Sequence, residues 1–319
     1  MAVELICQQC GKRYLVKPSV ARKGRRHCSK KCHNESMRRR VQLVCKHCGK
    51  NFSVIPSRSH QQYCSRRCRD MVWNKNLTPD QRRKYPVNDN ALNEWTPFSS
   101  YVLGLLAADG CIRDTRGRQG SYITISNIDR ILPEIVRELL APTKPLYEHK
   151  TATGTPLYRC DVHSKPLVAR LIQLGLVPRK SSVLRFPPVP NHVLGHFARG
   201  YLDGDGTVCI IKGQRVKGKD YPRYRGLLMN FVGTPEFLGE LSSRLSAATG
   251  VRAKNLKHRP EAKNCAVLQY RSKESCRLFH YLYGPTSEDP SGIPHLPRKW
   301  QRFMDFKDYA LAKGYWRME

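Results

Sequence analysis

The sequence predicts an α+β protein in which two similar halves follow two small metal-binding modules. Three observations lead to this architecture. A cysteine pattern repeats within the first 70 residues, two helix-like segments about 96 positions apart both end in Asp-Gly, and the same order of strand-like and helix-like runs follows each of them. We therefore expect a first zinc-binding module (1–40), a second zinc-binding module (41–70), a polar linker (71–95), a first half (96–187) and a second half (188–319).

The charge of the chain favours a nucleic-acid partner. The 319 residues include 57 Lys and Arg but only 25 Asp and Glu, which gives a net charge of +32. A charge of this size indicates a polyanionic partner, and nucleic acid is the usual one. A ribosome-associated or membrane-surface protein is the alternative, and charge does not distinguish DNA from RNA. The excess is densest in residues 1–70, which hold 18 basic and 3 acidic residues.

The sequence indicates an intracellular protein with no membrane partner. The opening MAVELICQQC has no apolar run as long as that of a signal peptide, and no segment approaches the roughly 18 apolar residues of a membrane span. We expect a cytoplasmic, nucleoid-associated protein with no secretion signal. In a reducing compartment the 13 cysteines favour metal binding or packing over disulfides.

The repeated cysteines predict two structural zinc ions. The spacings are C-x2-C-x17-C-x3-C and C-x2-C-x15-C-x3-C. Four thiolates complete the tetrahedral shell of zinc, and modules of about 30 residues need the metal in order to fold. The expected zinc ligands are Cys7, Cys10, Cys28 and Cys32, then Cys45, Cys48, Cys64 and Cys68. Nearby histidines that could replace a thiolate are expected at the surface instead, namely His27, His33, His47 and His60.

Lys and Arg side chains surround these cysteines and are placed to contact phosphates. We therefore expect the zinc modules to extend the nucleic-acid footprint of the protein. The alternative is a ribbon that binds another protein.

The two helix-like segments predict a second metal site. Thr96 and Pro97 are typical of a helix start, and Asn191 is expected to cap the second helix. Close packing of the two helices would bring Asp109 and Asp205 together at their C-terminal ends, where like charges and helix dipoles are unfavourable without a cation such as Mg²⁺. One Asp-Gly alone is usually a plain turn, and the matched copies favour the metal site. The small residues expected to allow this helix packing are Gly104, Ala108, Gly200 and Gly204.

These segments resemble the two motifs of the LAGLIDADG homing endonuclease family, in its single-chain form with two repeats. The matching stretches are VLGLLAADG (102–110) and ARGYLDGDG (198–206), and the resemblance covers residues 96 to about 310. It implies a LAGLIDADG fold of two pseudo-symmetric αββαββα halves, and it marks Asp109 and Asp205 as the metal-binding acids. The sixth motif position, which is often acidic, is Ala107 in the first copy and Asp203 in the second.

The remaining elements follow the same order in both halves. Strands are expected at about 111–116, 121–127, 144–151 and 156–163, and at about 207–214, 224–233, 251–259 and 265–272. Helices are expected at 129–140 and 165–174, and at 234–249 and 274–283. Alternation, as at Ile123 and Ile125, places one strand face on a core, and Cys111 and Cys209 are expected to pack there.

The resemblance implies that the other sheet face lies in the DNA major groove, where polar and basic side chains read base edges. At each position the alternative is a solvated surface charge. The expected DNA-binding residues are Arg113, Arg116, Arg118, Tyr122, Lys212, Arg215, Lys217 and Arg225.

A Pro-Arg-Lys sequence is also repeated, at 178–180 and 297–299. By the same resemblance, Lys180 and Lys299 are expected beside the cleavage centre as catalytic residues, where they would stabilise developing charge or organise the attacking water. A simple phosphate contact is the alternative.

These expectations describe a Mg²⁺-dependent, site-specific endonuclease that hydrolyses double-stranded DNA. Because the two halves differ in sequence, the target is expected to be long and not palindromic, and the protein to act as a monomer. The resemblance implies intron homing. The alternatives are a binder that does not cut, such as a maturase that assists an intron RNA or a regulator, and a zinc-ribbon interaction protein.

Overall fold

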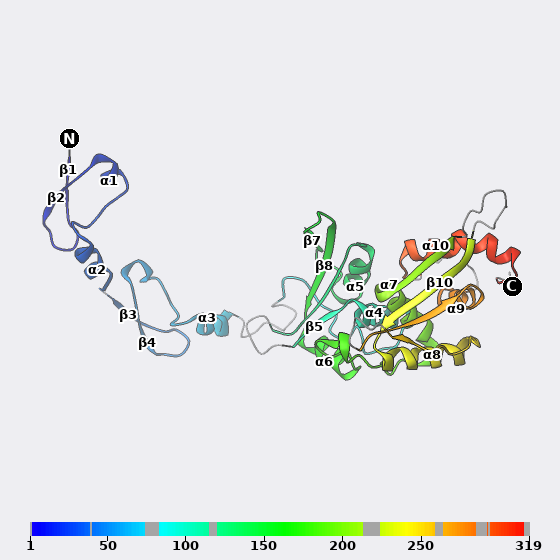
Figure 1. Ribbon diagram of the computed structural model, residues 1–319. Helices are drawn as coiled ribbons and strands as arrows, with labels where there is room; N and C mark the ends of the chain where they lie inside the picture. Colours follow the sequence, from blue (N-terminus) through cyan, green and yellow to red (C-terminus); the bar gives the residue numbers. More distant parts are fainter. Residues whose placement is uncertain are drawn as a thin grey trace. The chain divides into compact units, whose positions relative to one another are not determined.

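The computed structural model describes residues 2–38, 40–73, 83–114, 120–212, 224–258, 264–284, 292 and 294–315. The chain forms two compact units, Met1–Arg82 and Arg83–Glu319 (Figure 1). None of the helices in the described ranges is long and apolar enough to cross a bilayer.

The first unit contains two copies of one small module. The first copy has an antiparallel pair of strands, β1 (Val3–Ile6) and β2 (Arg13–Val16), followed by α1 (Pro18–Arg22) and α2 (Lys30–Arg38). The second copy has β3 (Val41–Val44), β4 (Asn51–Val54), a 3-10 turn (Pro56–Arg58) and α3 (Arg66–Trp73). The buried apolar side chains of the described part of this unit are Cys7, Val16, Cys32, Cys45 and Val54. So small a core is insufficient to keep the modules folded without a metal ion.

The second unit has the predicted αββαββα order twice, which confirms the predicted fold class. The first half consists of α4 (Pro97–Ala108), β5 (Cys111–Arg113), β6 (Tyr122–Asn127), α5 (Ile131–Leu140), β7 (Tyr147–Lys150), β8 (Pro156–His163) and α6 (Lys165–Gln173). The second half consists of α7 (Leu194–Asp205), β9 (Gly206–Lys212), β10 (Tyr224–Gly233), α8 (Pro235–Thr249), β11 (Lys257–His258), β12 (Ala266–Arg271) and α9 (Lys273–Tyr283), with α10 (Pro297–Ala312) after it. Each half has one antiparallel sheet, of order β5-β6-β8-β7 or β9-β10-β12-β11.

Helices α4 and α7 lie side by side at the centre of the second unit (Figure 1). Every residue of α4 from Ser99 to Ala108 is buried, which explains why this segment is apolar on all sides. In the neighbouring sheet, Ile123 and Ile125 face the core while Thr124 between them does not. The core of the unit is therefore built around the helix pair.

The two central helices begin differently. Thr96 caps α4 as predicted: its side chain accepts the backbone N–H of Ser99, and the Ser99 hydroxyl oxygen accepts the N–H of Thr96. The predicted cap at Asn191 is wrong, because Asn191–Val193 forms a 3-10 turn and α7 begins at Leu194. The Asn191 side chain instead accepts a hydrogen bond from Arg244 on α8.

Three further details differ from expectation. Cys111 is exposed rather than packed in the core, since alternation in β5 gives the inward position to Ile112, and Cys209 is half-buried. The strand expected at 251–259 is reduced to Lys257 and His258 at the sheet edge.

Residues 83–95, which were expected within the linker, belong to the second unit. Arg83 pairs with Asp89 at 3.0 Å, the Ser164 hydroxyl donates to Asp89, and Leu92 is buried. This segment therefore packs against the first half and is hydrogen-bonded to it.

Candidate active site and nucleic-acid interface

Glycines allow α4 and α7 to touch through their backbones. A Cβ atom added at Gly104 would overlap the carbonyl oxygen of Phe197, and one at Gly200 would overlap the carbonyl oxygen of Tyr101. Near the C-terminal ends, a Cβ at Gly204 would overlap the Cβ of Ala108. The structure thus brings the four small residues together along one contact line, where any larger side chain would separate the helices.

This packing places Asp109 and Asp205 at adjoining helix ends. A Cβ at Gly204 would lie only 3.5 Å from the carboxylate carbon of Asp109. Burial raises the pKa of Asp109. The pKa of Asp205, which keeps an exposed side, is raised to about 6 by desolvation and then by repulsion from Asp109. Two carboxylates that are hard to ionise together form a site that a cation would stabilise.

Two buried lysines bind the ends of these helices. Lys180 Nζ donates to the carbonyl oxygen of Ala108 at 2.8 Å, at the C-terminus of α4. Lys299 Nζ donates to the carbonyl oxygens of Leu202, Asp203 and Gly206 at 2.5, 2.9 and 2.6 Å, at the C-terminus of α7. Each lysine therefore caps the helix of its own half, and the two positive charges together favour the ionised forms of both aspartates.

Burial disfavours the charged form of the two lysines, as it does for the two acids. It lowers the pKa of Lys180, and it lowers the pKa of Lys299 to about 8. The exposed fractions of Lys180 and Lys299 are only 6% and 3%, so both ammonium groups lie beneath the protein surface. Their charges partly offset the repulsion between the carboxylates.

Asn127, at the end of β6, holds one of the two acids. Its Nδ2 donates to Asp109 Oδ2 at 2.8 Å, and its Oδ1 accepts the backbone N–H of Asp129 at 2.9 Å. The Asp129 carboxylate in turn pairs with Arg298 at 2.8 Å, so a contact from the second half supports the first acid. Arg298 is thus engaged within the protein.

Asp203 has a structural position beneath the site. It is 1% exposed, it accepts the hydroxyl of Tyr101 at 2.7 Å and the backbone N–H of Leu296 at 2.8 Å. Arg199, also 1% exposed, lies over the ring of Tyr101 and donates to the carbonyl oxygens of Leu282 and Pro294. Asp203, at the sixth motif position, therefore links α7 to α4 and to the start of α10 through these hydrogen bonds.

The sheet face away from the core of the first half carries polar and aromatic side chains. The Arg113 guanidinium lies 5.9 Å from the ring centroid of Tyr122, and that ring lies 5.1 Å from the ring of His163. On the same face, Arg159 Nε donates to Asp161 at 2.7 Å. Two predicted DNA-binding residues, Arg113 and Tyr122, thus lie together on this face.

The corresponding face of the second half has its own polar row. Gln269 Nε2 donates to Asn230 Oδ1 at 3.0 Å, and Lys257 Nζ donates to Gln269 Oε1 at 2.6 Å. Lys212 and Arg225 belong to β9 and β10. The other predicted DNA-binding residues lie outside the described residues, namely Arg116, Arg118, Arg215 and Lys217.

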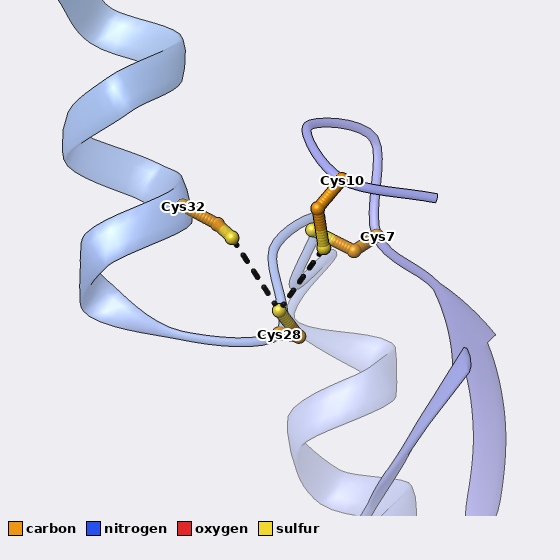
Figure 2. A group of neighbouring side chains, drawn as sticks. All are labelled: Cys7, Cys10, Cys28 and Cys32. Carbon is orange, nitrogen blue, oxygen red and sulfur yellow. Dashed lines mark hydrogen bonds between the residues drawn. The ribbon is translucent and has the colours of Figure 1, made fainter. Parts of the chain in front are cut away.

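In the first module, Cys7, Cys10, Cys28 and Cys32 converge (Figure 2). The sulfur of Cys28 lies 3.6 Å from the sulfurs of Cys10 and Cys32. This distance is close to the sulfur–sulfur separation of about 3.8 Å in a tetrahedron with Zn–S bonds of about 2.3 Å. Although desolvation opposes it, backbone N–H donors lower the pKa of Cys7 to about 6. The four thiol groups therefore fit a zinc ion.

The second module repeats this arrangement with Cys45, Cys48, Cys64 and Cys68. The Cys64 sulfur lies 3.7 Å from Cys48 and 3.5 Å from Cys68, and backbone donors lower the pKa of Cys45 to about 6. In the described ranges, these two groups are the clusters of three or more Cys, His or acidic side chains that could share an ion, and neither includes a histidine.

A basic cavity of about 550 Å³ opens beside the first cysteine cluster. Its charged lining includes Arg25, Arg26 and Lys30. His27 and His33 also line it, with their Nδ1 atoms 3.4 Å apart. The cavity is suited to an anion.

No family model and no curated protein matches the chain. Solved structures that it resembles include LAGLIDADG homing endonucleases. The meganuclease I-AabMI, bound to uncleaved DNA, is 14% identical with a TM-score of 0.43, over 70% of this chain and 94% of that one. The homing endonuclease I-WcaI, bound to its recognition sequence, is 12% identical with a TM-score of 0.44, over 71% and 94%.

Several site residues were not found from the sequence. Asn127 has no counterpart in the second repeat, so the duplication gave no signal for it. The polar residues at Arg159, Asp161 and Gln269 alternate with buried ones along β8 and β12, and this alternation is the signal that would have identified them.

Proposed function

We propose that this protein is a site-specific endonuclease that cuts both strands of DNA, with Asp109 and Asp205 as the metal-binding acids. The observation that carries the proposal is the pair of aspartates at the adjoining C-terminal ends of α4 and α7, each backed by a buried lysine. The sequence resemblance of the two motifs supports the same reading.

The donor atoms at this site fit a hard divalent cation. Carboxylate oxygens, with solvent access at Asp205, are ligands that Mg²⁺ takes. Bound there, Mg²⁺ would neutralise charge on the phosphate and lower the pKa of a water molecule. Lys180 and Lys299 hold the helix ends in place and add positive charge where a phosphate would sit. Each aspartate is expected to serve mainly one strand.

The outer sheet faces are the surfaces proposed to bind the duplex. Each presents polar and basic side chains in rows, such as Arg113 with Tyr122 and Lys257 with Gln269. Such groups can donate to base edges and phosphates. Because the two rows have different residues, the target should be long and not palindromic, and a single chain should suffice to bind it.

The zinc modules are proposed to extend DNA binding. The basic cavity lined by Arg25, Arg26 and Lys30 is a suitable phosphate contact. A protein lacking residues 1–70 should bind the same target more weakly, with a shallower dependence of the logarithm of affinity on the logarithm of salt concentration. Equal affinity and slope would contradict this role.

The proposed function is tested by cleavage of a large genomic or randomised DNA pool with Mg²⁺, followed by sequencing of the ends. Ca²⁺ serves as a control that permits binding without the expected cleavage. One recurring long site, cut only with Mg²⁺, would support the proposal. Tight binding without cuts, in a pool known to contain the cognate site, would favour a binder such as a maturase or a regulator.

A further inference from the structure

One oxygen of the Asp109 carboxylate is held by a hydrogen bond from the end of β6. Asn127 Nδ2 donates to its Oδ2, while Asn127 Oδ1 is occupied by the N–H of Asp129. Because that N–H needs an acceptor, the oxygen end of the amide must face Asp129 and the NH₂ end must face Asp109. The ion pair of Asp129 with Arg298 fixes the same loop from α10.

The second half has glycine where the first half has this asparagine. In the sheets, Ile112 pairs with Ile123, and the matching pair is Val208 with Met229. Asn127 is four residues after Ile123, and the fourth residue after Met229 is Gly233.

The position at Gly233 has no room for a side chain. A Cβ atom there would lie 2.7 Å from the hydroxyl oxygen of Tyr201, which donates to the carbonyl of Val232 at 2.8 Å. In the first motif the residue equivalent to Tyr201 is Leu105, which has no hydroxyl. The tyrosine thus occupies in one half the space that the asparagine uses in the other.

The two lysines also differ between the halves, in how many of their N–H donors are occupied. An ammonium group has three N–H donors. Lys299 directs its donors to three backbone carbonyls, whereas the single acceptor of Lys180 Nζ among the described residues is Ala108. Lys180 therefore has N–H donors that no acceptor takes among the described residues.

We propose that Asn127 is a positioning residue that makes the two cleavage centres unequal, so that the strand served by Asp109 is cut first. The inference rests on the proposed function. A ligand that is oriented before binding loses less freedom when the site assembles, which favours the first-half centre. No residue within the described ranges donates a hydrogen bond to the Asp205 carboxylate, so this ligand would be ordered only when the metal ion and DNA bind.

Cleavage of a supercoiled plasmid bearing the selected target, with each strand labelled, tests the order of cutting. Asp109→Asn and Asp205→Asn first identify the strand that each acid serves. In the otherwise unchanged protein, the Asp109 strand should be cut first. Asn127→Ala should slow that strand by about tenfold or more, without changing the rate for the other strand. A misfolded variant would slow both strands, so the second strand is an internal control.

Asn93→Ala is the matched control. It removes the same amide from an exposed position outside both sheets, where its partner is Asn90 rather than an acid. The ratio of the two cutting rates should stay unchanged in this variant.

A measurement without cleavage completes the test. Calorimetric titration of Ca²⁺ into the DNA complex of the Asp205→Asn protein reports on the Asp109 site, and adding Asn127→Ala should weaken Ca²⁺ binding several-fold. Two strands cut at equal rates, or an unchanged rate ratio and unchanged Ca²⁺ affinity in Asn127→Ala, would overturn the inference while leaving the endonuclease intact. Absence of cutting in the unmodified protein would instead overturn the proposed function, and this inference with it.

Discussion

Tyr101 and Asp203 lie 102 positions apart in the chain, yet the tyrosine hydroxyl donates a 2.7 Å hydrogen bond to the carboxylate inside the buried helix pair. The bond joins the two halves below Asp109 and Asp205. Burial raises the pKa of Asp203 despite the opposing charge of Lys299 and this hydrogen bond. The buried carboxyl group is therefore stabilised by the hydrogen bonds that it accepts from the Tyr101 hydroxyl and the Leu296 N–H.

Removal of the tyrosine hydroxyl should destabilise the second unit. In Tyr101→Phe, the buried Asp203 loses one of its two donors, which costs about 1–3 kcal/mol in the free energy of unfolding. Urea denaturation measures the change. Tyr201→Phe is the matched control, since its hydroxyl donates to a backbone carbonyl and not to a buried acid. Its cost should be smaller, about 1 kcal/mol, and equal costs would contradict a special role for Asp203.

The helix contact makes a prediction about glycine substitutions. Gly200→Ala should destabilise the protein by on the order of 3 kcal/mol, because the new methyl group would overlap the carbonyl of Tyr101 and push the helices apart. Gly239→Ala, in α8, has open space around the added atom and should stabilise by about 0.5–1 kcal/mol. Thermal unfolding of both variants gives the comparison, and a neutral Gly200→Ala would argue against close backbone packing.

The aspartates are predicted to be essential for cutting and dispensable for binding. Asp109→Asn or Asp205→Asn should abolish double-strand cleavage, because each removes an anionic metal ligand, while DNA affinity in Ca²⁺ persists. Cleavage gels and fluorescence anisotropy measure the two properties. Full double-strand cleavage by either variant would refute the assignment.

The raised pKa of Asp205 predicts how stability depends on pH. Its pKa is about 6 in the folded protein and near 3.8 when unfolded, so the folded state binds the proton more tightly. Stability from this group is present below the unfolded pKa and is lost as pH rises through 6. Without divalent cations, Asp205→Asn should therefore melt at a higher temperature than the unmodified protein at pH 8. The difference should vanish near pH 4, and a difference that grows toward low pH would contradict the predicted direction.

The cysteine clusters predict two bound zinc ions. Native mass spectrometry should find two in the unmodified protein and one in Cys7→Ser or Cys45→Ser, because each variant breaks one group of four thiolates. Cys265→Ser, outside both groups, should retain two. Retention of both ions by Cys7→Ser would show that the site does not need this thiol.

The order of elements could be predicted because it depends on local patterns. The cap at Thr96 and the alternation at Ile123 and Ile125 are signals within a few residues, and the structure has both of them. The Asn191 cap failed because a partner on α8, Arg244, takes its side chain. No local pattern indicates that partner.

The site was predictable in part for the same reason. Duplication pointed to Asp109 and Asp205, and to the lysines near them. The capping of helix ends by those lysines depends on a loop and a helix that return from 72 and about 95 residues away. Asn127 could not be inferred from symmetry, because the repeat has glycine at that position.

The Tyr101–Asp203 bond also bears on which halves can pair. By motif position, Tyr101 corresponds to Phe197, and Asp203 to Ala107. Two copies of the second half, paired with twofold symmetry, would set each Asp203 against a phenylalanine and bury two carboxyl groups without that hydroxyl donor. Two copies of the first half would leave each tyrosine hydroxyl facing alanine. Both homodimers are penalised relative to the covalent pair, so this one contact favours the two-half chain over either symmetric dimer.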